Sequence, residues 1–256
     1  MILSRLTWQD VESLSREVTF LVPTGSLEQH GPHLPLFTDS LIATAVAEGV
    51  ERNLSEQVVL TPTLWMGASG HHLAFPGTIS ASFETYEGAI VSLVESLLPH
   101  GFRKFYFLNG HGGNTEPNGV ALRKLKARFP AGLFGHLGYF SLIEDAIAGV
   151  LEGPAKDMRH ACEAEASLIM HLHPDLVRTD KLRDDGLRTE PPVKGAVLHF
   201  DEFTEEGSLG YATLATSAKG RTIYEAAVQA CTTEIERFGG GFVLVGIDPR
   251  SQTVST

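Results

Sequence analysis

Apolar runs and amphipathic stripes alternate along the first 150 residues. Continuous apolar runs predict strands over residues 18–22, 58–64, 102–108 and 133–140. Elsewhere apolar residues recur at three- and four-residue spacing, which predicts helices over residues 8–14, 42–50, 86–97, 118–128, 142–150, 161–172 and 217–238. Strands that alternate with helices are typical of a parallel sheet covered on both faces, so the pattern predicts an α/β fold.

Local signals set the expected boundaries of several elements. Pro23 should stop the first strand, and Gly101 should end the helix that precedes the third strand. Thr38 or Asp39 is placed to cap the helix that follows the first strand. Residues 178–210 are polar and interrupted by prolines and glycines, and we expect this stretch to be irregular.

Length and composition predict one globular domain. The chain has 256 residues, of which 43% are hydrophobic and 20% charged. We find no repeat, low-complexity tract or linker, and therefore expect a single domain over residues 1–256. The two cysteines, Cys162 and Cys231, show no CxxC spacing, which fits a reducing compartment. Asp10 and Glu12 precede any apolar run long enough for a signal peptide, so we expect a cytoplasmic location.

The net charge of the chain restricts the classes of binding partner that we expect. Thirty-one acidic residues against 20 basic ones give a net charge of −11, which repels a phosphate backbone and disfavours nucleic acid. No apolar stretch is long enough to span a bilayer, so a membrane is not an expected partner either. A small-molecule substrate is the partner that we expect.

Three candidate metal ligands stand in and after the polar loop that follows the first strand. Glu28 and His30 are two positions apart, so an extended backbone would direct both side chains to one side. Asp39 follows at the start of a helix. Two carboxylates and an imidazole suit zinc, manganese or iron. Alternatively, Asp39 only caps its helix, and Glu28 and His30 lie on the loop surface.

A glycine-rich turn, NGHGGN, follows the third strand and contains His111. Its glycines let the backbone approach a ligand closely, and the N–H groups of Gly112, Gly113 and Asn114 could bind a substrate oxyanion. Such a turn could instead cradle a phosphate. It lacks the lysine of a phosphate loop and the spacing of a dinucleotide loop, so we prefer a metal-binding His111. Ligands of parallel sheets bind beyond the strands' carboxyl ends, where both loops should meet.

The helix expected over residues 161–172 contains the third candidate group. Glu165 falls within its apolar stripe, where a carboxylate is costly unless it is paired or binds a metal. A buried ion pair with a lysine or arginine is the alternative. Glu163 lies off the stripe and should be solvated, which makes Glu165 the preferred ligand. His160, at the start of this helix, suits a general acid/base or substrate-binding role.

Together these segments resemble the creatininase family, the creatinine amidohydrolases and their relatives. The resemblance rests on PTGSLEQHGPHLPLFTD, HLAFPGT, LNGHGGN and HACEAEAS followed by HPDLV, in the family's order and over roughly the first two-thirds of the chain. It implies a three-layer α/β/α fold, a centre of two divalent metal ions and a homo-oligomer, often a hexamer.

The resemblance also assigns roles. It implies that Asp39 bridges the two ions and that His160 is catalytic. The remaining ligands that it implies are Glu28, His30, His111 and Glu165. His72, just before the matching FPGT, is a candidate for the substrate pocket.

One departure from the family's pattern bears on the substrate. Enzymes that open creatinine carry a Tyr and a Glu directly after the histidine matched by His111, where this chain has Gly112 and Gly113. They also carry a Trp where this chain has Lys156. Since those groups form much of the creatinine pocket and one metal contact, we do not expect creatinine as the substrate. The turn resembles the broader family, which includes deformylases, a peptide-trimming enzyme of redox-cofactor maturation and a cyclic-polyol-ketone hydrolase.

Three functions therefore stay open at this point. The main hypothesis is an amidohydrolase that uses metal-activated water to cleave a non-peptide C–N bond, in a cyclic amide, a formamide or a similar small molecule. The first alternative is a peptidase that trims a small precursor peptide. The second is a non-catalytic module that binds a phosphate ligand through NGHGGN.

Overall fold

Four parallel strands form the centre of the molecule. The structure is a computed structural model that describes residues 1–187 and 195–240. The strands are β1 (Thr19–Thr24), β2 (Val58–Leu60), β3 (Lys104–Asn109) and β4 (Leu133–Gly138), in the order β2-β1-β3-β4. All three pairings are parallel, as the alternation of strands and helices predicts.

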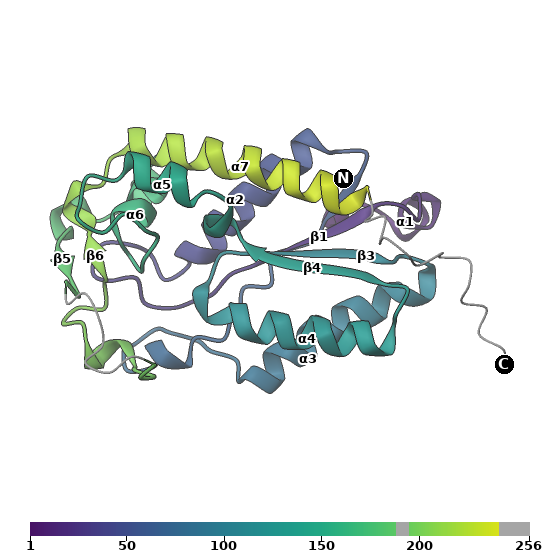
Figure 1. Ribbon diagram of the computed structural model, residues 1–256, viewed down its shortest axis with the longest axis horizontal. Coiled ribbons are helices and arrows are strands. Elements are labelled where there is room, and N and C mark those ends of the chain that lie inside the picture. Colours follow the sequence, from purple (N-terminus) through teal and green to yellow (C-terminus); the bar gives the residue numbers. More distant parts are fainter. Residues whose placement is uncertain (188–194, 241–256) are drawn as a thin grey trace.

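Helices cover both faces of this sheet and make three layers (Figure 1). One face carries α2 (Thr38–Asn53), α5 (Glu144–Val150), α6 (Glu163–Leu172) and α7 (Ser217–Gly239). The other face carries α3 (Phe83–Leu97) and α4 (Thr115–Arg128). Each layer buries its own apolar cluster against the sheet. The α/β fold with a parallel sheet between helices is thus confirmed. No described helix is both long and apolar enough to cross a bilayer.

A short helix and a small two-stranded sheet lie at opposite ends of the molecule (Figure 1). Helix α1 (Trp8–Ser13) begins with a capping box, in which Thr7 and Asp10 exchange hydrogen bonds. Strands β5 (Asp184–Asp185) and β6 (Gly210–Tyr211) pair antiparallel at the other end. The stretch expected to be irregular therefore contributes a short sheet, although its residues 188–194 lie outside the described residues.

The first strand does not stop at Pro23, contrary to our expectation. Strand β1 continues to Thr24, and Pro23 is opposite Leu108 of β3. Odd-numbered residues of β1 direct their backbone polar groups toward β2, as the bond from the Thr61 N–H to the Leu21 carbonyl shows. Because β2 pairs only with residues 19–21, no bond of this ladder needs the N–H that Pro23 lacks.

Other boundaries also shift. Strand β2 ends at Leu60, so the strand expected over residues 58–64 is too long; Leu64 makes only an isolated bridge. Helix α2 begins at Thr38, after an N-cap residue, Phe37, and neither predicted cap acts as one. The Thr38 hydroxyl donates to the Pro35 carbonyl, and the Asp39 carboxylate takes part in the site described below.

Helices α6 and α7 cross in close contact at a glycine. A Cβ atom on Gly220 of α7 would lie 1.8 Å from the carbonyl oxygen of Ser167 in α6. This distance is far below any real contact, so only glycine lets the two backbones approach this closely. The close approach fixes the position of α6, whose first turn carries two buried carboxylates.

We expect Gly220→Ala to lower the free energy of unfolding by roughly 1–3 kcal/mol or more, because the new methyl group must separate α6 from α7. Gly88→Ala in α3 is the matched control, since its added Cβ meets no described atom within 4 Å. That change should stabilise the protein by about 0.5–1 kcal/mol through backbone entropy. Urea unfolding of the two variants measures both effects; equal stability of the two would contradict the helix contact.

Candidate metal centre

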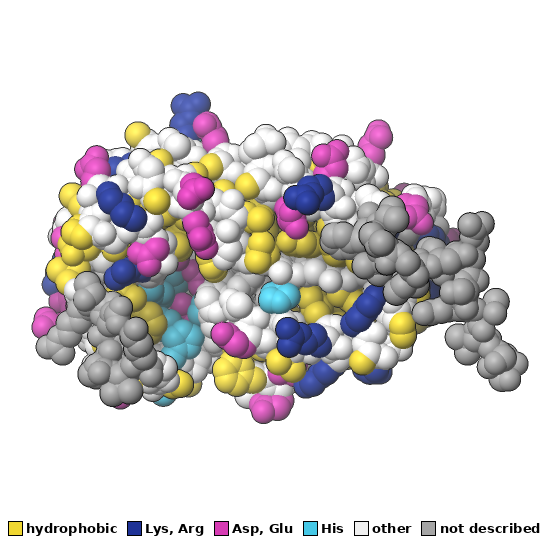
Figure 2. Space-filling model, viewed as in Figure 1, with side chains coloured by type: hydrophobic (Ala, Val, Ile, Leu, Met, Phe, Trp, Pro, Cys, Tyr) yellow, Lys and Arg dark blue, Asp and Glu magenta, His cyan; other side chains and the backbone are white. Residues whose placement is uncertain are grey.

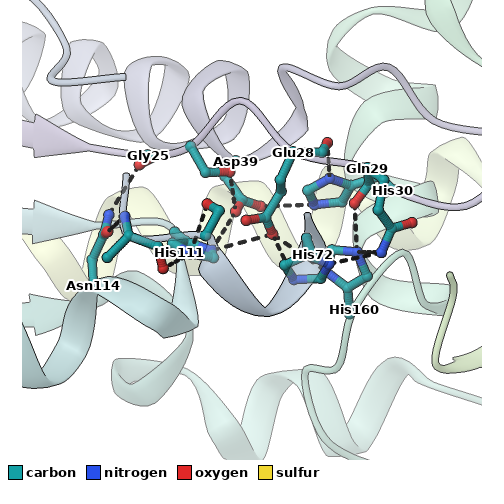
Figure 3. Close-up of polar contacts among 12 residues, drawn as sticks. Gly25, Glu28, Gln29, His30, Asp39, His72, His111, Asn114 and His160 are labelled. Atoms are coloured by element: carbon teal, nitrogen blue, oxygen red, sulfur yellow. Dashed lines mark hydrogen bonds and ion pairs between the residues drawn. The ribbon is translucent and has the colours of Figure 1, made fainter. Parts of the chain in front are cut away.

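The predicted metal ligands meet beyond the carboxyl ends of β1 and β3 (Figure 3). Glu28 and His30 follow β1, and His111 follows β3. A Cβ atom on Gly110 would lie 2.8 Å from the backbone oxygen of Asp39, so glycine is what lets the His111 turn rest against the start of α2. The sheet register thereby brings two loops and one helix start to a common point.

Asp39 lies between two histidines. Its Oδ1 is 2.9 Å from His30 Nε2, and its Oδ2 is 3.0 Å from His111 Nδ1. The hydroxyl of Ser26 donates to Oδ2 as well. Asp39 is 3% exposed, so both of its carboxylate oxygens are shielded from solvent. A carboxylate placed in this way can bridge two ions.

Backbone carbonyls set the tautomers of both histidines. His30 Nδ1 lies 3.2 Å from the Glu28 carbonyl oxygen, and His111 Nε2 lies 3.2 Å from the Ala68 carbonyl oxygen. Only an N–H can donate to a carbonyl, so these nitrogens carry hydrogen. The opposite ring nitrogen of each histidine faces the carboxylates, which is the usual orientation of a metal-binding histidine.

The environment of the Glu28 carboxylate indicates whether a metal ion fits this site. Its side chain is fully buried, and among the described residues neither carboxylate oxygen has a hydrogen-bond partner. The nitrogens of His72, His111 and His160 lie 3.3, 3.3 and 3.6 Å from Oε1 without the geometry of a hydrogen bond. An unsatisfied buried carboxylate is costly. A divalent cation would remove that cost, so the residues fit a metal.

The side chains group into two ligand sets that flank Asp39. Ligand atoms of Glu28, Asp39 and His111 lie within 4.8 Å of one another, and so do those of His30, His160 and Glu165. His30 also lies against Asp39, which gives the second set a carboxylate shared with the first. Buried clusters of this composition are consistent with a binuclear centre. A third group, Glu28 with His72 and His160, overlaps both.

The two glutamates at the start of α6 serve different purposes. Glu165 is 5% exposed and lies 3.9 Å from His30 Nε2. Glu163 is 2% exposed, so the expectation that it is solvated is wrong. It accepts hydrogen bonds from the backbone N–H groups of Glu152 and Gly153 and from Lys219 of α7. The buried ion pair that was the alternative for Glu165 is therefore made by its neighbour.

A strained residue holds Glu165 in place. Ala161 has φ +48°, and no other non-glycine residue of the described ranges has a positive φ. Its N–H donates to Glu165 Oε2, and its carbonyl accepts a hydrogen bond from His33 Nε2. Left-handed backbone is unfavourable for alanine, and these two bonds offset that cost. They also restrict where the carboxylate can point.

His160 and His72 belong to these groups and are also linked through Gln29, which the sequence analysis did not single out. The His160 Nε2–H donates to the Gln29 carbonyl at 2.7 Å. The Gln29 amide donates to His72 Nδ1 at 2.8 Å and to the Gly207 carbonyl. His160 Nδ1 consequently faces the carboxylates. The position of Gln29 between Glu28 and His30 was the signal that could have identified it.

The glycine-rich turn is divided between binding and support. Gly112–Asn114 forms one 3-10 turn before α4. Gly112 and Gly113 line the cavity above the cluster. The N–H of Asn114 instead donates to the His111 carbonyl, and its side chain bonds the Ala68 N–H and the Gly25 carbonyl. In this structure Asn114 joins three loops, while the two glycines face the ligand space.

The cavity has a volume of about 280 Å³ and opens to solvent. Figure 2 shows histidine side chains gathered in a hollow at the end of the molecule that carries β5 and β6. Beyond the predicted ligands, the cavity is lined by residues that the sequence analysis did not identify: Phe140, Met158, Arg159, Phe200 and Leu209. Their sequence spacing is irregular, and no motif marks them.

Electrostatic coupling shifts the pKa values of the cluster. Burial alone would lower the pKa of His30, yet Asp39 and the neighbouring glutamates raise it to about 9. The pKa of His111 is likewise raised, against burial, by Glu28 and Asp39. Burial raises the pKa of Glu165, and Asp39 adds to it, to about 8. Burial would also raise the pKa of Asp39, but the two histidines hold it well below its usual value.

These shifts predict that metal binding releases protons. The pKa of about 9 means that His30 is protonated at neutral pH in the metal-free protein, and a cation must displace that proton. Zinc affinity, measured by chelator competition, should therefore rise by about tenfold per pH unit for each proton displaced, up to the pKa of His30. Calorimetry in buffers of different ionisation enthalpy counts the protons. Affinity that does not change with pH would contradict this arrangement.

The roles of the two glutamates can be separated by matched substitutions. Glu165→Gln should lower metal content and leave the metal-free protein as stable as wild type, because a carboxylate is removed from a crowded acidic site. Glu163→Gln should retain the metal but lower the free energy of unfolding by about 3 kcal/mol, because Lys219 loses its buried partner and keeps only the exposed Glu152 carboxylate. Elemental analysis and urea unfolding measure the two effects. The reverse pattern would make Glu163 the ligand.

Comparisons with known proteins agree with this geometry. The family model described as creatininase, creatinine amidohydrolase, matches residues 4–235. A mycofactocin precursor peptide peptidase of Mycobacterium tuberculosis is 36% identical over 238 residues, which cover 88% of this chain and 87% of the relative. A creatinine amidohydrolase of Pseudomonas putida is 31% identical, with 92% and 96% covered.

Solved structures show the same fold. A manganese form of creatininase superposes with a TM-score of 0.80 at 30% identity, and covers 93% of this chain and 98% of its own. A mutant creatininase of the Zn-Zn type gives 0.81 at 30% identity, with the same coverage. The buried cluster of this chain is consistent with a binuclear site like those of the zinc and manganese forms. Sequence, fold and cluster lead to one conclusion: the chain belongs to the creatininase family.

Proposed function

We propose that this protein is a two-metal hydrolase that cleaves an amide C–N bond in a short peptide or a peptide-like substrate. The observation that carries the proposal is the fully buried Glu28 carboxylate, without a hydrogen bond in the described residues, facing Asp39 and His111. The first ion would be held by Glu28, Asp39 and His111, and the second by His30, Asp39 and Glu165. When bound, the ions would activate a water molecule and polarise the scissile carbonyl.

His160 is the proton carrier of the proposal. Burial, with His30 nearby, holds the pKa of His160 well below its usual value, so the ring is neutral at pH 7. Its Nε2–H is fixed on the Gln29 carbonyl, which leaves Nδ1 free to accept the proton of the attacking water. The same nitrogen then returns the proton to the departing amine.

Two observations favour a peptide-like substrate over the non-peptide amide of our main hypothesis. The relatives at 36% identity are named as peptidases, and those named for creatinine are less similar. In addition, an added Cβ on Gly112 would meet no described atom within 4 Å, so the space above the turn is open. An open space at this position suits the extended backbone of a peptide.

The phosphate-binding alternative is disfavoured by the geometry of the glycine-rich turn. The turn before α4 is a single 3-10 turn, and its Asn114 N–H already donates to the His111 carbonyl. Few N–H groups therefore remain to bind an anion. A phosphate ligand therefore fits this cavity poorly.

The first experiment is metal analysis of purified wild-type protein beside His111→Ala, with His100→Ala as the matched control on the exposed surface. We expect about two equivalents of transition metal in the wild type and in the control, and less in His111→Ala. A panel of short peptides, cyclic amides and formamides should show cleavage of peptides that is lost on metal removal. His160→Ala should lower kcat by roughly 10²–10⁴-fold and retain the metal.

The outcomes separate the candidate functions. Cleavage of cyclic amides or formamides without cleavage of peptides would restore our main hypothesis. Full activity and full metal content in His111→Ala would contradict the proposed metal centre.

A further inference from the structure

The cavity wall away from the metal ligands combines apolar side chains with one cation. Phe140, Met158, Phe200 and Leu209 supply the apolar surface, and Arg159 is the one arginine or lysine among the described lining residues. These residues come from four separate segments of the chain. The N–H of Leu209 donates to the His160 carbonyl at 2.7 Å, so this wall is fixed directly to the catalytic segment.

Phe200 extends the apolar wall up to the proton carrier. Its ring centroid lies 4.0 Å from that of His72 and 4.6 Å from that of His160. An apolar side chain of a substrate bound at the metal ligands would contact this ring, and its burial would contribute to affinity.

Arg159 has donors left for a ligand. Its Nε donates to Asp157 Oδ1 at 2.9 Å, and its two terminal NH₂ groups have no hydrogen-bond partner among the described residues. The Arg159 side chain is 23% exposed, whereas its partner Asp157 is 63% exposed and is therefore well hydrated. The remaining edge of the planar guanidinium matches a carboxylate, which it can bind through two parallel bonds.

Charge in the cavity favours the same ligand. Three carboxylates line it, and two divalent cations would exceed their charge even without Arg159. Arg159 adds a further positive charge beside the apolar wall. A substrate with a negative group at a distance from the scissile bond would be attracted to this position.

We propose that Arg159 binds the free carboxyl terminus of the substrate, so that the enzyme hydrolyses an amide bond close to the end of a peptide whose terminal side chain is apolar. This inference rests on the proposed function. The reaction takes up one water, forms a new carboxyl group and releases an amine that carries the terminal carboxylate.

The test uses peptide pairs that differ only at the end, a free acid and its C-terminal amide, both ending in phenylalanine. We expect the wild type to prefer the acid by roughly 10–100-fold in kcat/KM, mainly through KM. Arg159→Met should lose this preference, because the KM of the acid rises toward that of the amide, while the metal content stays as in the wild type. Arg159→Lys should retain part of it. Arg128→Met, which removes an arginine paired with Glu95 on the far face, is the matched control.

A binding measurement gives a readout without turnover. The probes are 3-phenylpropionate and 3-phenylpropionamide, titrated into wild type and Arg159→Met in the metal-loaded and metal-free forms. The proposed site is supported if Arg159→Met weakens the binding of 3-phenylpropionate at least tenfold in both the metal-loaded and the metal-free form. Binding that Arg159→Met leaves unchanged would show that the metals alone hold the carboxylate, and would overturn the inference.

The two proposals fail in different ways. If the wild type binds metal and cleaves acids and amides equally, the Arg159 site is wrong and the proposed function stands. If no peptide is cleaved but 3-phenylpropionate binding still depends on Arg159, the carboxylate site stands and the peptidase is wrong.

Discussion

The burial of three carboxylates in one small space is the constraint on which the rest of the structure depends. Glu28, Asp39 and Glu165 are at most 5% exposed. Their mutual repulsion in a poorly hydrated site must be offset by positive charge, from protons on His30 and His111 or from cations. The unsatisfied oxygens of Glu28 and the shifted pKa values are consequences of this crowding. A site of this kind is costly to keep unless it binds metal.

The fold brings these residues together without any long-range signal in the sequence. Strands β1 and β3 are neighbours, and their carboxyl ends coincide, so the loops after them must meet. The starts of α2 and α6 then face the same point. Supporting contacts, such as the bond from Ala161 to Glu165 and the ion pair of Glu163, fix side chains that the backbone only brings near.

Much of this could be predicted from the sequence. The alternation of strand-like and helix-like hydrophobic patterns predicted the parallel sheet, and the predicted ligands lie close together in space. The burial argument placed Glu165 on the apolar stripe, but it could not foresee Glu163. That residue lies off the stripe, and its burial depends on backbone N–H groups ten residues earlier and on Lys219, which lies in a helix more than 50 residues later. Likewise, Pro23 was expected to end the first strand because it lacks an N–H donor. That donor is needed only where a neighbouring strand extends beside it, and β2 does not extend that far. Arg159 and Phe200 belong to no motif, and only the three-dimensional structure brings them to the cavity.

The link between Lys219 and Glu163 also bears on the order of assembly during synthesis. Every candidate ligand lies within the first 165 residues, whereas the lysine that anchors the first turn of α6 belongs to the last described helix. A nascent chain therefore contains every candidate ligand before α7, which packs against α6, has been synthesised. Helix α6 can reach its final position against the sheet only after the chain has been completed through α7.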